Sequence, residues 1–164
     1  MTRRVPAVRV SLWLVPLLVA ACGFHLQGRT QLPRSLTSVR IDARDTQSDF
    51  YGALRASLLS SGARLDGPAG EAATIHILND DASEQVLTVS ATRNIPTAFL
   101  LSYRVRLSVD YQGRELLAPE LHTVTREYSF DERALLAKQR EREVLQQALA
   151  DDLAAQIMRR LAVL

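Results

Sequence analysis

The sequence predicts an α+β domain in which two helices pack on one face of a four-stranded, mostly antiparallel sheet. Three patterns support this prediction. Between residues 99 and 111 apolar side chains recur at every second position, which is the period of a strand with one buried face. Between residues 145 and 161 they recur at every fourth position, as in an amphipathic helix. A shorter helical pattern near residue 54 lies between two further strand-like segments.

The first two elements are a strand and a helix. Residues 36–41 are expected to form the strand, because Val39 and Ile41 place apolar side chains on one face. The helix is expected to begin with Ser48 or Asp49 as N-cap and to end near a glycine. The residues that mark its apolar stripe are Phe50, Leu54 and Leu58, with Leu59 at the margin, and Gly62 marks its end.

Three strands are expected next. Residues 74–78 and 85–91 have the pattern of one strand in two parts, and the polar residues 79–81 between them indicate a bulge or a break. The alternating residues 99–111 form the second strand. A Gln-Gly turn follows it, and residues 121–130 return as the third strand.

A long helix is expected over residues 132–161. Asp131 is a suitable N-cap, and Glu132 lies in the first turn, where the helix dipole favours a negative charge. The expected buried stripe is Leu145, Leu149, Leu153, Ile157 and Leu161, widened by Val144, Ala148 and Met158. Such a helix packs along a sheet, which completes the predicted domain.

The N-terminal segment has the pattern of an export signal. Three arginines precede an apolar run over residues 10–19, which is about half of the ~20 residues that a membrane-spanning helix needs. Val-Ala-Ala-Cys at 19–22 resembles the bacterial lipobox. That resemblance implies cleavage before Cys22, diacylglycerol on its sulfur and a palmitoyl chain on its amino group. The chain then divides into a signal peptide (1–21), a lipid anchor and tether (22–35) and one domain (36–164).

An ordinary secretory signal is the alternative, with Cys22 as a free thiol or a disulfide partner. Cys22 is the only cysteine of the chain, so it has no partner within it. Two acyl chains already anchor a protein stably in a membrane. Gly23 follows the cysteine in place of the Asp that usually retains such lipoproteins in the inner membrane. We therefore expect a location on the periplasmic side of the outer membrane.

Composition and motifs exclude several classes of function. Removal of the signal peptide takes away three arginines and leaves 17 basic and 18 acidic residues, so no general positive field would attract nucleic acid. No nucleophile elbow, Walker loop or metalloprotease motif is present. The histidines His25, His76 and His122 are isolated in the sequence, so we expect no metal site, no cofactor and no enzyme activity. A lipid-anchored hydrolase that uses Glu120 and His122 is the alternative.

A binding site for an anionic ligand is easier to place. In the predicted meander, Arg93 lies in the loop at the end of the sheet where the last helix begins, and Lys138 lies about two turns into that helix. Both cations would lie near the positive helix end, where a phosphorylated ligand is favoured. Arg104 and Arg106 extend positive charge along the exposed face of the sheet. The alternative is that all four are solvated surface charges.

Several local motifs together resemble the LptE family of lipopolysaccharide-assembly lipoproteins. They are Cys-Gly-Phe-His-Leu-Gln-Gly at 22–28, Leu-Pro-x-x-Leu-x-x-Val-x-Ile at 32–41, Arg-Asn-x-x-Thr-Ala at 93–98, Leu-Ala-Lys-x-x-Glu at 136–141 and Gln-Ile-Met-Arg-Arg-Leu at 156–161. Their order and the lipobox make the resemblance span nearly the whole chain after residue 21.

This resemblance implies both a fold and a role. The fold would be two helices on a four-stranded sheet, in agreement with the residue patterns. The role would be to plug the β-barrel LptD at the outer membrane, to assist its assembly and to bind lipopolysaccharide through lipid A phosphates. Arg93 and Lys138 match the positions credited with that binding, whereas no family motif covers Arg104 and Arg106. A general envelope scaffold lipoprotein that binds no lipopolysaccharide is the alternative.

Overall fold

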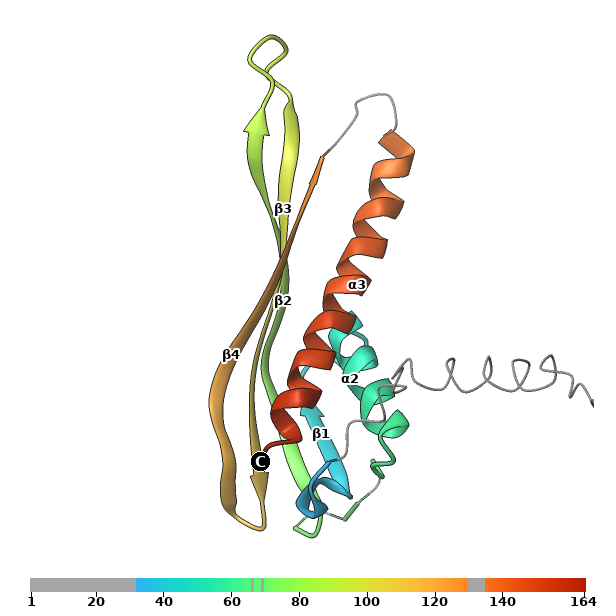
Figure 1. Cartoon of the computed structure of the whole chain (residues 1–164), viewed down its shortest axis with the longest axis vertical. Helices are drawn as coiled ribbons and strands as arrows, with labels where there is room; N and C mark the ends of the chain where they lie inside the picture. Colours follow the sequence, from blue (N-terminus) through green and yellow to red (C-terminus); the bar gives the residue numbers. More distant parts are fainter. Residues whose placement is uncertain (1–31, 66, 69, 130–134) are drawn as a thin grey trace, which may run out of the picture.

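A mixed four-stranded sheet with two long helices forms the domain in the computed structural model (Figure 1), which describes residues 32–65, 67–68, 70–129 and 135–164. Side chains are described from residue 140 onward in the last helix. The elements are η2 (Arg34–Leu36), β1 (Val39–Ala43), α2 (Asp49–Ser60), β2 (Ala73–Val89), β3 (Pro96–Tyr111), β4 (Arg114–Ser129) and α3 (Leu135–Leu161). The predicted fold class is confirmed.

The strands lie in the order β1-β2-β3-β4. β1 and β2 are parallel because α2 crosses over between them, and the other two pairs are antiparallel hairpins. β1 pairs only with residues 73–77 of β2. The rest of β2 therefore forms a long hairpin with β3 that continues past the end of β1 (Figure 1).

All four strands begin at different positions from those predicted, and the shift is one residue in β2, which begins at Ala73, and three in β3, which begins at Pro96. Leu36 lies in the short helix η2, so β1 begins at Val39. β4 begins at Arg114, because its pairing with β3 starts directly after the turn, at Tyr111. The predicted irregularity in β2 is a bulge between Ile77 and Asn79, and the strand continues beyond it.

The helices cover one face of the sheet, and their caps follow the local sequence. Ser48 is the N-cap of α2, and its hydroxyl accepts the Tyr51 N–H at 3.1 Å. Gly62, at φ 92°, ends that helix in the left-handed region. The large side chains that are fully buried between the helices and the sheet include Phe50, Leu54, Leu58, Ile75, Leu101, Leu107, Leu149, Leu153, Ile157 and Leu161.

The predicted apolar stripe of the last helix is correct in its C-terminal part and wrong at Val144. Leu145 is partly buried, whereas Val144 is 68% exposed. The first residue of α2, Asp49, accepts a hydrogen bond from Gln146 of α3, and the N-terminal part of α3 extends beyond α2 (Figure 1). Val144 precedes this contact, so α2 does not cover it. Among the described residues, no helix combines the length and the apolar composition needed to cross a membrane.

Candidate functional site

The loop between β2 and β3 and the start of α3 lie at the same end of the molecule (Figure 1). The register shows why, because Ala98 at the start of β3 pairs with Ser129 at the end of β4. The predicted placement of the two segments is therefore confirmed. The loop projects beyond the first turn of α3.

Backbone hydrogen bonds order this loop. The Ser90 N–H donates to the Ile95 carbonyl, and the Asn94 N–H donates to the Ser90 carbonyl, both at 2.8 Å. Asn94 has φ 54°, a left-handed conformation that asparagine tolerates. Arg93 precedes it and is exposed at the tip.

Two of the predicted site residues are not described in full. Lys138 lies in the helical part of α3, but its side chain lies outside the described residues. Cys22 and the tether before residue 32 also lie outside them. The roles of Cys22, Arg93 and Lys138 therefore stay predictions.

Sequence reasoning missed a charged cluster between the projecting part of the sheet and α3. The carboxylate oxygen Oε2 of Glu84 accepts the Tyr128 hydroxyl at 2.9 Å and lies 3.2 Å from Nε of Arg142. Glu84 pairs across the sheet with buried Leu101, so it lies on the face toward the helices. The sequence feature that could have revealed this cluster is a glutamate whose side chain points toward the helices. Alternation alone did not show it, because the bulge at Leu78 changes which residues of β2 point inward.

The opposite face of the sheet is less positive than predicted. Arg104 lies there, and its Nη2 is 2.8 Å from Oδ2 of Asp81. Arg106 is exposed beside it. The charge of Arg104 is thus balanced by Asp81 on the neighbouring strand β2. Because both side chains are exposed, this ion pair adds little to stability.

His76 joins three strands on the same face. Its Nδ1 lies 3.0 Å from Asp42 of β1, and its Nε2 lies 2.5 Å from Asp110 of β3. Burial by itself lowers the pKa of His76, but the hydrogen bonds and charges of Asp110 and Asp42 outweigh it and raise the pKa above 6.5. Both carboxylates stabilise the protonated, imidazolium form of His76.

Folding stability should therefore depend on pH through His76. Because the pKa is raised in the folded state, the stabilisation is complete below the unfolded pKa of 6.5 and is lost as pH rises through the folded value. Urea unfolding of the wild type and of His76→Gln between pH 5.5 and 8.5 checks this. The difference in unfolding free energy between the wild type and His76→Gln should shrink as pH rises. A difference that stays constant with pH would contradict the stabilisation of protonated His76 by the two carboxylates.

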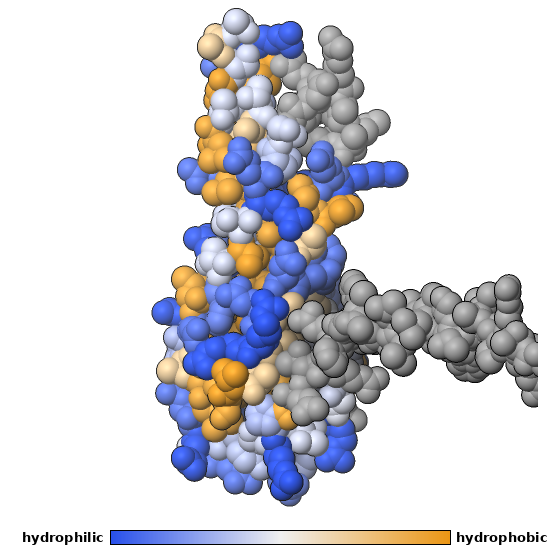
Figure 2. Space-filling view, viewed as in Figure 1, coloured by the Kyte–Doolittle hydropathy of each residue, from blue (hydrophilic) through white to orange (hydrophobic). Residues whose placement is uncertain are grey.

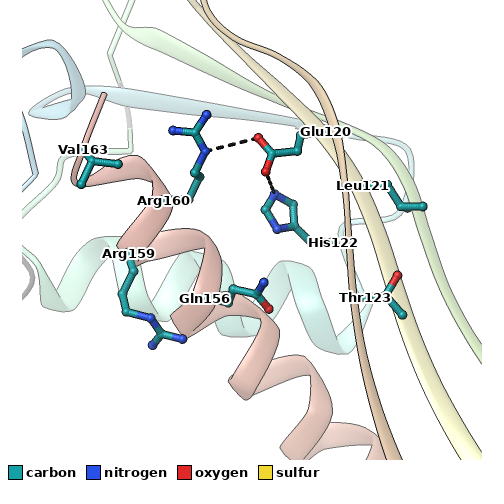
Figure 3. Close-up of a pocket in the computed structure, with 8 residues that line it drawn as sticks. All are labelled: Glu120, Leu121, His122, Thr123, Gln156, Arg159, Arg160 and Val163. Carbon is teal, nitrogen blue, oxygen red and sulfur yellow. Dashed lines mark hydrogen bonds and ion pairs between the residues drawn. The ribbon is translucent and has the colours of Figure 1, made fainter.

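Glu120 and His122 do come together, in an open depression of about 640 Å³ between β4 and the end of α3 (Figure 3). Nε2 of His122 lies 3.5 Å from Oε1 of Glu120, and Oε2 of Glu120 lies 3.3 Å from Nε of Arg160. His122 is 6% exposed, and its Nε2 forms no hydrogen bond within the described residues.

A hydrolase would need a nucleophile beside this histidine. Thr123 is the one hydroxyl residue that lines the depression, and its side chain lies on the other side of β4 (Figure 3). The arrangement instead ties β4 to α3. In the part of the chain that the structure describes, no three His, Cys, Asp or Glu residues are grouped to hold a metal ion.

Comparisons with known proteins agree with this geometry. The family model described as LptE, lipopolysaccharide-assembly, matches residues 36–161. The chain is 30% identical over 157 residues to the LPS-assembly lipoprotein LptE of Pectobacterium atrosepticum, with 92% of this chain and 82% of that protein covered. It is 33% identical over 155 residues to the protein of the same name from Yersinia enterocolitica, with 93% and 73% covered.

Solved structures share the fold. The solution structure of an uncharacterized lipoprotein B from Nitrosomonas europaea has a TM-score of 0.69 and 26% identity, and the match covers 85% of this chain and 90% of that one. The crystal structure of the rare lipoprotein B from Shewanella oneidensis has a TM-score of 0.69 and 22% identity, with 77% and 94% covered.

Proposed function

Because this chain belongs to the LptE family of lipopolysaccharide-assembly lipoproteins, we propose that it is an outer-membrane lipoprotein that binds lipopolysaccharide and assists assembly of the LptD β-barrel. It plugs the lumen of that barrel. It carries out no catalysis, and acylated Cys22 holds it on the periplasmic side of the membrane. The family match over residues 36–161 is the observation that carries this proposal.

The part of the β2–β3 hairpin that extends past β1 has surface properties that suit a ligand that is both apolar and anionic. Val86, Leu87 and Val89 of β2 are half-exposed, and Figure 2 shows orange and pale surface over this upper part of the sheet. Arg93 adds a cation at the tip. Lipid A combines acyl chains with phosphates, so it matches both properties. We therefore assign its phosphates to Arg93 and Lys138.

The first experiment isolates the partner. The tagged lipoprotein is purified from outer membranes in mild detergent, and mass spectrometry identifies what remains bound. A β-barrel in equal amount is expected. Recovery of the lipoprotein without a barrel would refute the plug role and favour a general envelope scaffold.

A second prediction tests the lipid site. The double variant Arg93→Glu, Lys138→Glu should weaken lipopolysaccharide binding by about tenfold or more, because each lost charge-assisted hydrogen bond is worth ~1.5–3 kcal/mol when shielded from water. Binding of the purified protein to labelled lipopolysaccharide measures this. The control is Arg55→Glu, Arg114→Glu, which makes the same charge change at exposed positions away from the loop between β2 and β3. Equal binding by the two double variants would refute the site.

A further inference from the structure

We propose that Arg142, oriented by Glu84, is a further phosphate-binding residue of the lipid A site. This inference rests on the proposed function, because it adds a residue to the same site. It concerns the cluster between the projecting part of the sheet and α3, whose members are all described in the structure.

The two charged side chains differ in exposure. The Glu84 side chain is 20% exposed, whereas the Arg142 side chain is 51% exposed. The contact of 3.2 Å uses Nε of the guanidinium. The inner edge of the guanidinium therefore faces a mostly buried carboxylate, and half of the arginine remains accessible to a ligand.

The carboxylate is held by a rigid partner. Tyr128 is buried, and its ring stacks on Phe99 with the ring centres 5.4 Å apart. Burial, and then the hydrogen bond to Glu84, raise the pKa of Tyr128 to about 12, so its hydroxyl remains a donor at neutral pH. One carboxylate thus joins β2, β4 and α3, and it sets the direction of Arg142.

The remaining donors suit a phosphate. A guanidinium has five N–H groups in a planar fork, and four of them lie on the two terminal nitrogens, away from Nε. The ion pair with Glu84 joins the carboxylate to Nε of Arg142. Two parallel N–H groups match two oxygens of a phosphate, which an ammonium group cannot do.

The location suits an amphiphile. Position 138 precedes Arg142 by four residues, which is one turn on the same face of α3. On β2, half-exposed Val86 follows Glu84 by two residues and so lies on the same face of the strand. Arg142 on α3 and Val86 on β2 therefore lie on facing elements, one helical turn from position 138.

Glu84 allows two opposite expectations. If it only adds negative charge near the site, its removal should strengthen the binding of an anion. If it positions Arg142, its removal should weaken binding, because the guanidinium then loses its fixed direction. Glu84→Gln separates the two, since the amide oxygen still accepts from Tyr128 while the charge is lost.

The experiment measures binding of the full-length acylated lipoprotein, in detergent, to lipopolysaccharide and to lipid A without phosphates. Arg142→Gln is expected to weaken lipopolysaccharide binding about tenfold, and Arg142→Lys should restore part of it. Glu84→Gln should weaken it severalfold, and the double variant should bind as weakly as Arg142→Gln does. All variants should bind lipid A without phosphates as the wild type does.

Arg104→Gln is the matched control, because the Arg104 side chain is 47% exposed, close to that of Arg142, and forms an ion pair with Asp81 on the opposite face. Its lipopolysaccharide binding and its unfolding midpoint give the baseline. Wild-type binding by Arg142→Gln, alongside weak binding by Arg93→Glu, Lys138→Glu, would overturn this inference and leave the proposed function standing. Wild-type binding by that double variant would overturn the proposed site itself. Tighter binding by Glu84→Gln would refute the positioning role.

Discussion

Replacing Cys22 with Ala should abolish acylation and remove the lipoprotein's own hold on the membrane. The lipobox resemblance implies three acyl chains on this residue, and two are sufficient for stable anchoring. Intact-mass measurement should find wild-type protein that begins at Cys22 and carries the acyl mass, and Cys22→Ala without it. An acylated Cys22→Ala fraction would contradict the anchor.

Release from the membrane needs a separate variant and a control. The chain from Gly23 onward, exported behind a conventional secretory signal, should appear in the soluble periplasmic fraction wherever no barrel retains it. Gly23→Asp is the matched control, because it keeps the cysteine and should change the destination to the inner membrane. If the unacylated chain stayed in membranes without LptD, another membrane contact would have to exist.

Of the substitutions proposed for this protein, Leu153→Ala should lower the free energy of unfolding most. Leu153 lies in α3, is 0% exposed and belongs to the core formed with α2 and the sheet. Truncation of a fully buried leucine leaves a cavity and costs about 2–5 kcal/mol of unfolding free energy. Urea unfolding of the domain measures the loss as a lower midpoint with an unchanged slope.

Val144→Ala is the matched control on the same helix. Val144 is 68% exposed, and alanine favours helix more than valine does, so the free energy of unfolding should change by less than about 0.5 kcal/mol. Equal losses for the two variants would contradict the exposure of Val144. An unchanged midpoint for Leu153→Ala would contradict the described core.

Local patterns were sufficient wherever a residue acts with its near neighbours. Alternation predicted the long strand that forms β3, and the four-residue period predicted α3. Ser48 and Gly62 marked the ends of α2, because capping depends on residues within one turn. The same patterns misplaced the starts of β1, β3 and β4, since a strand begins where its partner allows pairing.

Contacts between distant residues needed the tertiary structure. Val144 continues the helical pattern, yet whether a helix face is buried depends on what lies opposite it. Asp42, His76 and Asp110 come together through strand pairing, although the histidine is isolated in the sequence. Arg142 and Glu84 are also far apart along the chain.

The sequence by itself determined the fold class, the order of the elements, the family and the candidate residues Cys22, Arg93 and Lys138. The tertiary structure decided that Glu84 faces Tyr128 and Arg142, and that His76 lies between Asp42 and Asp110. The physical reason is register. One extra residue in β2 changes which of its later side chains face the helices, and a local pattern cannot show how strands pair across the sheet.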